Sequence, residues 1–363
     1  MAELCEIPSP SRDEAAVAAF VRAELASLGA DVTEDDAAAA IGCGCGNIVA
    51  RFAATAPGTP IMFGAHLDTV PQDGPIEVVL DDDGMLRNRH PTILGGDNKS
   101  AVATLLTAAR QIVESGRPHA GIELLFTPCE EIGLLGAAHF DPSRLRAALG
   151  FVFDHTGPVG DVVGSAPTLQ KLHATFVGVP AHAGISPEDG RSAIDAAARA
   201  IGRMTLGRID EQTTANIGTI SGGTATNVVS ERCEITAEAR SRDPKRLAAQ
   251  VETMIDGFTA AATDGEVDLA LALRTEFHGY TLRERDTQVA FAFDALRAAG
   301  YTPKLVPSGG GSDANALLTN GFPAVNLCNG MVAPHTSGEC IAADDLDRMV
   351  VVVLGLAARA LAG

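Results

Sequence analysis

The chain has 363 residues, of which 46% are apolar and 20% are charged. This composition excludes a long disordered chain, and the length allows two or three domains at roughly 150 residues each. Asp and Glu number 46 against 27 Lys and Arg, which gives a formal charge of −19. Such a surface repels phosphate backbones and anionic lipids, so we expect neither a nucleic acid nor a membrane as a partner.

The seven cysteines are an odd number scattered over a long chain, unlike the dense and even framework of a small secreted domain. The first residues, MAELCEIPSPSRDE, lack the basic and apolar segments of a signal peptide. The longest charge-free apolar run in a helical context, residues 349–358, is about half a membrane span. We therefore expect a cytoplasmic protein.

Helical and strand patterns alternate through the first part of the chain and return at its end. Short apolar runs have the length of strands that are buried on both faces. These runs lie at residues 47–52, 61–65, 122–127, 151–153 and 324–328. Helical spacing of apolar residues occurs at residues 13–28, 100–113, 287–299 and 344–361. This alternation predicts an α/β fold with a mixed, mostly parallel sheet flanked by helices.

The middle of the chain has a different pattern, typical of an α+β unit with an open-faced sheet that carries two helices. Strands are predicted near residues 171–179, 232–240 and 267–273, and helices at residues 191–204 and 244–262. In the first of these helices, the apolar face is predicted to contain Ile194, Ala197, Ala198, Ile201 and Met204. We expect residues 169–276 to be inserted into a domain formed by residues 1–168 and 277–363.

Potential metal ligands stand just past the carboxyl ends of the predicted buried strands, where open α/β sheets place their binding crevices. They are His66 and Asp68, Glu130 and Glu131, Asp154, and His335, with Asp97 at the start of a predicted helix. Two histidines and several carboxylates suit zinc, cobalt or manganese. Each residue alone also has a structural explanation as a capping or solvated group. Repeated charges directly after strands too apolar to be exposed favour one shared site.

Five segments resemble the motifs of the co-catalytic zinc hydrolases, a family that includes peptidase T, the glutamate-releasing carboxypeptidases, aminoacylase and succinyl-diaminopimelate desuccinylase. The segments are GAHLDTVP at 64–71, GGDNKSA at 95–101, TPCEEIGLLG at 127–136, FVFDH at 151–155 and PHTSGE at 334–339. Their order and spacing match over nearly the whole chain. The segment CEEIGLLG and the total length are most similar to the peptidase T branch.

The resemblance implies two zinc ions, or cobalt or manganese in their place. Asp97 would bridge the two ions; His66 and Asp154 would complete one site, and Glu131 and His335 the other.

The resemblance also implies roles for residues beside the metals. Asp68 would accept the second ring N–H of His66 and so fix its tautomer. Glu130 would take a proton from the attacking water and deliver it to the leaving amine.

The inserted unit resembles the family's ferredoxin-like lid domain, which often makes the dimer contact, so a homodimer through this domain is expected. His182 in PAHAGISP would stabilise the oxyanion of the tetrahedral intermediate. Asn227 and Arg240 match substrate-contacting positions, and Gly310 lies in a glycine-rich segment whose backbone N–H groups could meet substrate oxygens. A surface histidine, a solvated arginine and a plain glycine loop are the alternative readings of these residues.

Three positions depart from the pattern of peptidase T relatives. Asn98 stands where a second acid commonly follows the bridging aspartate, and Ser100 replaces a small apolar residue. Cys129 stands where relatives often have a polar or acidic residue, and we expect it to be a small buried hydrophobe.

The resemblance, together with the cluster of potential ligands, implies a dizinc metallohydrolase of amide bonds, an aminopeptidase that releases N-terminal residues from tripeptides or other short peptides. Alternatives within the family are an N-acyl amino acid hydrolase, a dipeptidase or a carboxypeptidase, because specificity depends on contacts outside the metal site. A non-catalytic metal-dependent binding protein is the alternative of another class. A dinucleotide site is not supported, because GCGCG at residues 42–46 lacks the GxGxxG spacing.

Overall fold

The computed structural model describes residues 1–362, and the chain divides into two compact units. Unit 1 consists of Met1–Ser165 together with the chain from Thr281 onward, and unit 2 consists of Ala166–Tyr280. Within the described range, every helix is too short or too polar to cross a lipid bilayer.

A mixed sheet with four parallel strands at its centre forms the core of unit 1. These central strands are β6 (Ile122–Thr127), β3 (Ile61–His66), β7 (Leu149–His155) and β16 (Ala324–Cys328), in that order across the sheet. Their residues are almost all buried, as expected for short runs of Ile, Leu, Val and Phe covered on both faces. The rings of Phe63, Phe151 and Phe153 pack together, with centroid separations of 6.0 and 6.4 Å from Phe63.

Antiparallel strands extend this sheet on both sides. At one side β2 (Ile48–Phe52) pairs antiparallel with β6, and β1 (Asp31–Glu34) with β2. On the other side lie β8 (Val162–Ala166), which pairs antiparallel with β16, then β14 (Tyr280–Thr281), and β15 (Leu305–Pro307), which runs parallel to β8. A separate small sheet contains β4 (Val78–Leu80), β5 (Met85–Asn88) and β17 (Cys340–Ala342).

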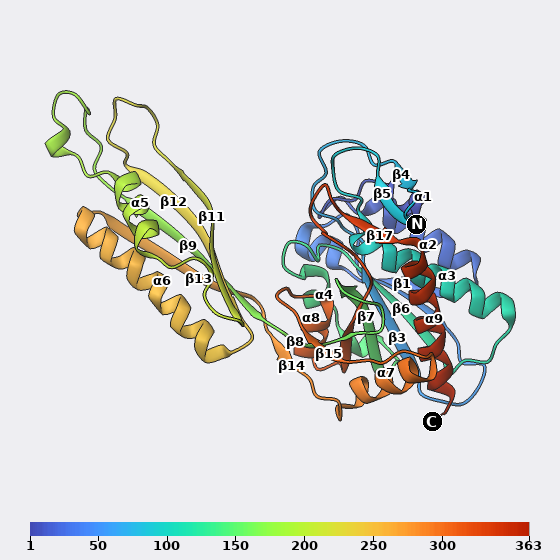
Figure 1. Ribbon diagram of the computed structural model, residues 1–363. Helices are drawn as coiled ribbons and strands as arrows, with labels where there is room; N and C mark the ends of the chain where they lie inside the picture. The colour runs from blue at the N-terminus through green and yellow to red at the C-terminus, as the bar shows by residue number, and fades with distance from the viewer. Residues whose placement is uncertain (363) are drawn as a thin grey trace. The chain divides into compact units, whose positions relative to one another are not determined.

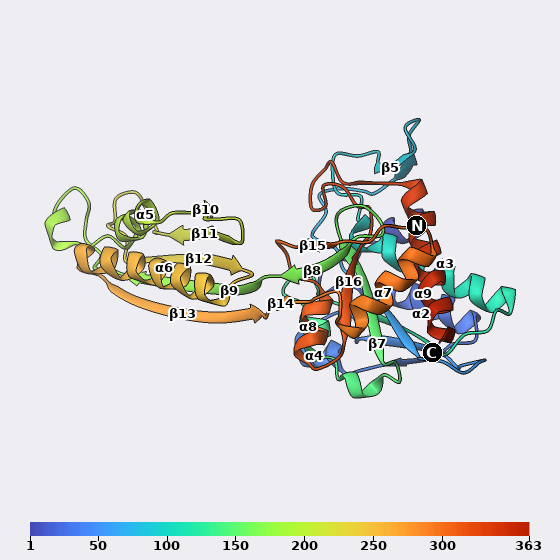
Figure 2. The ribbon, with the colours of Figure 1, turned by 60° about the horizontal axis from the view of Figure 1, so that its bottom comes forward.

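Helices cover both faces of the central sheet (Figures 1 and 2). One face carries α2 (Ala15–Ser27), α3 (Gly96–Ser115), α7 (Thr287–Ala298) and α9 (Ala343–Arg359). The other face carries α4 (Leu135–His139) and α8 (Asp313–Thr319). The short elements α1 (Ala2–Cys5), η1 (Ala38–Gly42), η2 (Pro142–Arg144) and η4 (Ala360–Ala362) lie between or beyond these helices in the chain. The predicted mixed, mostly parallel sheet flanked by helices is confirmed.

Unit 2 is an antiparallel sheet with two helices on one face (Figure 1). The strand order is β10 (Gly207–Arg208), β11 (Thr213–Gly222), β12 (Arg232–Ser241), β9 (Thr168–Val177) and β13 (Asp268–Phe277). The helices α5 (Ala193–Arg203) and α6 (Pro244–Gly265) pack on each other and on the sheet, and η3 (Pro187–Asp189) precedes α5. Alternate residues of β12 are buried, as its period-two pattern predicts.

The predicted apolar face of α5 is wrong in part. Ile194 is 40% exposed and Ala198 is also exposed, whereas the buried residues are Ala193, Ala196, Ala197 and Ala200. Small side chains let α5 approach α6 closely: a Cβ added at Gly265 would lie only 3.1 Å from the Cβ of Ala196. Close packing therefore selects the alanines over the larger isoleucine.

Candidate metal and catalytic site

The candidate site lies at the carboxyl ends of the parallel strands of unit 1. His66 is the last residue of β3, Asp154 is the last but one of β7, and Glu130 and Glu131 come shortly after β6. Because β6, β3 and β7 are neighbouring parallel strands, their ends meet at one edge of the sheet. Asp97 comes from the irregular start of α3, where its backbone is not helical.

The carboxylate of Asp97 lies between two histidines. The Nε2 atom of His66 is 3.4 Å from Oδ1 of Asp97 and 3.5 Å from Oδ1 of Asp154. The Nε2 atom of His335 is 3.3 Å from Oδ2 of Asp97 and 3.0 Å from Oε1 of Glu131. The two oxygens of Asp97 therefore face two separate groups of potential ligands.

Each of these two groups can offer a metal ion three ligand atoms that lie within 4.8 Å of one another. One group is His66, Asp97 and Asp154, and the other is Asp97, Glu131 and His335. The structure thus brings all five of the predicted ligands together, with Asp97 in both groups. Imidazole nitrogens and carboxylate oxygens are ligands that zinc accepts, and one shared carboxylate suits a pair of ions.

The pKa shifts at the site indicate that it favours added positive charge. Burial raises the pKa of Asp154 to about 7, although His66 opposes the shift. Hydrogen bonding to Asp97 and Glu131 raises the pKa of His335 to about 10. Bound protons and bound cations both offset the repulsion between crowded carboxylates, so a site that favours protonation also suits cations. The residues present therefore fit a metal centre.

Glu130 lies beside the ligands in a buried position. Its side chain is 8% exposed, and one carboxylate oxygen groups with ligand atoms of His66 and Glu131 within 4.8 Å. Burial, reinforced by the nearby charge of Asp154, raises its pKa well above the usual range. A carboxylate with a raised pKa is suited to accept and return a proton near neutral pH.

Asp68 contacts His66 differently from the expected arrangement. The Nδ1 atom of His66 is 2.9 Å from the backbone oxygen of Asp68, whereas the carboxylate is 3.5 Å away. That carboxylate accepts hydrogen bonds from the backbone N–H groups of Glu130 (2.9 Å) and Glu131 (3.2 Å), and from the hydroxyl of Ser11 (2.6 Å). Asp68 therefore orients His66 mainly through its backbone and uses its side chain to hold the segment that carries both glutamates.

The remaining predicted site residues lie outside this cluster or in unit 2. The N–H of Gly310 donates to the hydroxyl of Ser308 at 3.0 Å, so this amide already has a partner. In unit 2, His182 is exposed, and its backbone forms an isolated antiparallel β-bridge with Val228, the residue after Asn227. Their roles, like that of Arg240, remain predictions.

Within unit 2, Arg240 lies far from His182 and Asn227. It lies near the end of β12 and forms an ion pair with Glu238, Nε to Oε1 at 2.8 Å. The chain from Asn227 enters β12 at its opposite end, at Arg232, and a ten-residue strand spans roughly 30 Å.

Three buried residues beside the cluster were not assigned a role from the sequence. The Asp313 carboxylate accepts a hydrogen bond from the hydroxyl of Thr127, and burial raises its pKa to about 6. The carboxylate of Glu339 accepts hydrogen bonds from three backbone N–H groups, those of Leu94, Gly95 and Asp97. Asn98 is fully buried, and both atoms of its amide have no hydrogen-bond partner among the described residues. Glu339 lies within the PHTSGE motif, a signal that could have identified it.

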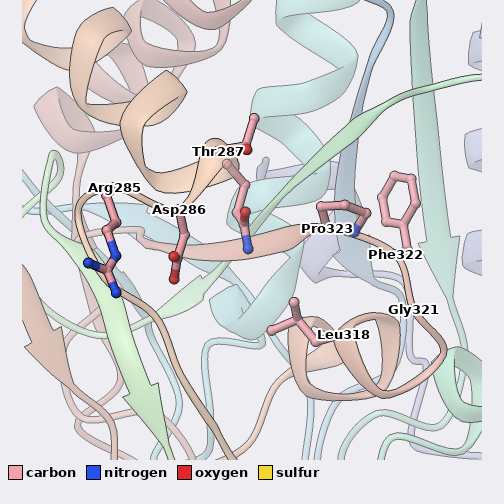
Figure 3. Close-up of a pocket in the computed structure, with 8 residues that line it drawn as sticks. Arg285, Asp286, Thr287, Leu318, Gly321, Phe322 and Pro323 are labelled. Carbon is pink, nitrogen blue, oxygen red and sulfur yellow. The ribbon is translucent and has the colours of Figure 1, made fainter.

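A hollow of about 450 Å³ lies elsewhere on unit 1, beside the start of α7 (Figure 3). Asp286 and Thr287 line it on one side, and Leu318, Phe322 and Pro323 on the other. Pro323 immediately precedes β16, at the end of the strand opposite to the metal-ligand cluster. None of the predicted site residues lines this hollow.

We expect the metal-free protein to lose stability as the pH rises from about 6 to about 8, because the folded state binds more protons than the unfolded state in this range. His335 contributes stability that is complete below its usual pKa of 6.5 and is lost as the pH approaches 10. Ionisation of Asp154 between its usual pKa of 3.8 and about 7 acts in the same direction. Urea denaturation of chelator-treated and zinc-supplemented protein would measure this, and the zinc-supplemented protein should show the smaller loss. Greater stability of the metal-free protein at the higher pH would contradict the expectation.

Comparison with known proteins agrees with the fold. Residues 62–359 match the model of peptidase family M20/M25/M40. The chain is 38% identical over 360 residues to YqjE of Bacillus subtilis, an uncharacterized protein, covering 98% of this chain and 97% of that protein. Proteins named Peptidase T, for example from Escherichia fergusonii, are 27% identical over 270 residues, and the match spans 65% of their length.

Two solved structures with a similar fold cover the whole chain. Aminopeptidase PepT from Bacillus cereus has a TM-score of 0.85 and 38% identity, and a tripeptidase from Staphylococcus aureus has a TM-score of 0.91 and 34% identity. Each alignment covers 100% of this chain and 97% of the other. The fold and the site define a peptidase of the metal-dependent class. The chain belongs to peptidase family M20/M25/M40.

Proposed function

We propose that this protein is a dizinc aminopeptidase that releases N-terminal residues from tripeptides and other short peptides. The observation that carries the proposal is the position of Asp97 between His66 and His335, with Glu130 beside them. The similarity to the Bacillus cereus aminopeptidase and the Staphylococcus aureus tripeptidase supports this substrate class. Cobalt or manganese could serve in place of zinc, because the ligand set accepts them.

Five residues of unit 1 would bind the two metal ions. His66, Asp97 and Asp154 would hold one ion, and Asp97, Glu131 and His335 the other. When bound, the ions would polarise the scissile carbonyl and acidify water.

Glu130 would take the proton from the attacking water and pass it to the leaving amine. Asp68 would keep Glu130 in place through the hydrogen bond it accepts from the Glu130 N–H.

For unit 2 we propose the role of a lid and dimerisation domain, spanning about residues 169–276. His182 would stabilise the oxyanion, and Asn227 and Arg240 would contact the substrate, with Gly310 of unit 1. Large aliphatic side chains on unit 2 support a protein contact there, since Ile185 is 76% exposed. Light scattering of the purified protein would test for a homodimer.

The substrate test compares matched peptides by kcat/KM: a tripeptide with a free N-terminus, its N-acetylated form, a dipeptide and an N-acetyl amino acid. We expect kcat/KM to be at least ~100-fold higher for the tripeptide with a free N-terminal amine. A site built to bind that polar group rejects analogues that lack it. Mass spectrometry should show the N-terminal residue as the first product, and elemental analysis should find two ions per chain. Exclusive cleavage of the blocked substrates, or first release of the C-terminal residue, would overturn the aminopeptidase assignment.

A further inference from the structure

The carboxylate of Glu339 connects two backbone segments that carry candidate metal ligands. Its Oε2 atom accepts hydrogen bonds from the N–H groups of Leu94 (2.9 Å) and Gly95 (3.0 Å), and its Oε1 atom accepts one from Asp97 (2.9 Å). Glu339 belongs to the same loop as His335. One side chain therefore ties the segment of Asp97 to the loop of His335.

Neither segment is held by regular secondary structure. Gly95 has a φ of 71°, in the left-handed region that favours glycine, and the backbone of Asp97 is not helical. His335 has a φ of 64°, which residues other than glycine seldom adopt. Such conformations persist only where surrounding contacts determine them. The hydrogen bonds of Glu339 are contacts of this kind.

Loss of the Glu339 carboxylate would leave the three backbone N–H groups without hydrogen-bond acceptors. Glu339 is 3% exposed, so water cannot readily replace it on the three N–H groups. Lys99 is fully buried nearby, and its Nζ atom donates to the backbone oxygen of Ile7 at 2.5 Å. The negative charge of Glu339 acts against the lowering of the Lys99 pKa that burial causes.

We propose that Glu339 is a positioning residue for the metal centre: it sets the relation of Asp97 to His335 and thereby controls the affinity for the ion held by Asp97, Glu131 and His335. This inference rests on the proposed function, since it presumes that these residues bind metal. His66 ends β3, and Asp154 lies within β7. The ion held by His66, Asp97 and Asp154 shares only Asp97 with the two segments that Glu339 joins, and it therefore depends less on Glu339.

The test is a zinc titration of Glu339→Gln against a chromophoric chelator. Glutamine has nearly the same volume, but its NH₂ group cannot accept the N–H groups that one carboxylate oxygen accepts. Substitution of a group that orients metal ligands typically weakens metal binding by about 10–100-fold. We expect this weakening for one of the two ions, so the number of zinc ions bound per chain after dialysis should fall from two toward one.

Glu123 provides a matched control. It is 2% exposed and accepts the backbone N–H groups of Arg146 (2.8 Å) and Ala147 (2.7 Å), but it lies at the opposite end of β6 from Glu130. Glu123→Gln should lower the urea midpoint and leave both zinc affinities unchanged, as a purely structural effect would.

The outcomes separate the inference from the proposed function. Two ions bound to Glu339→Gln at the parent affinity would overturn the positioning role alone. A parent protein that binds no zinc would overturn the proposed function, and this inference with it. If Glu339→Gln does not fold, Glu339→Asp is titrated instead, because it keeps the charge and shortens the reach; loss of one ion supports the role, and parent affinity overturns it.

Discussion

Replacement of Glu130 by glutamine should lower kcat by about 10²–10⁴-fold, the usual contribution of a positioned general base. Glutamine keeps the shape of the side chain but cannot take the proton of the attacking water. The metal content should stay at the parent value, because the two ligand groups around Asp97 do not require Glu130. Initial rates on a tripeptide, with elemental analysis of the same sample, measure both quantities.

The same substitution should not lower the stability of the fold. The raised pKa of Glu130 means that its buried charge is unfavourable in the metal-free protein, so a neutral amide should leave the urea midpoint equal or higher at neutral pH. Glu114→Gln, at an exposed position of α3, serves as the control and should keep the parent rate. Parent kcat in the Glu130 variant with both ions bound would show that another group is the base.

Replacement of Asp97 by asparagine should abolish hydrolysis by removing metal from both sites. Each oxygen of Asp97 faces a different histidine, and asparagine offers only one oxygen and no charge. Changes to groups that merely orient ligands cost about 10–100-fold in metal affinity, so loss of a shared ligand should cost each ion more than ~100-fold. Zinc titration of the chelator-treated variant measures this effect directly.

Asp36→Asn is a suitable control for that experiment. Asp36 also pairs with a histidine, His139, at 3.0 Å, but Asp36 is mostly exposed. We expect this variant to bind two ions with the parent affinity. Retention of both ions by Asp97→Asn would mean that Asp97 is not the shared ligand, and the two-ion arrangement would have to be reassigned.

The apolar patterns of the sequence were sufficient to predict the central strands of the sheet in unit 1, but not the strands β1, β8, β14 and β15 that extend it. Strands β3, β6 and β7 are runs of large apolar residues, and such runs are stable only where both faces are covered. The same reasoning placed polar residues just after these strands at one edge. It could not choose the buried face of α5, because hydrophobicity favours Ile194 while close packing against α6 requires the alanines.

By itself, the sequence determined which residues could bind metal and that their strands end at a common edge, since both follow from side-chain chemistry and from local periodicity. The resemblance of the motifs already implied that Asp97 is shared by two ligand groups. Only the tertiary structure decided that the carboxylate of Asp68 holds Glu130 and Glu131, and that Glu339 joins two ligand segments. These are contacts between residues far apart in the chain. Loop backbone conformation sets them, and spacing along a sequence carries no direct information about the direction in which a loop turns.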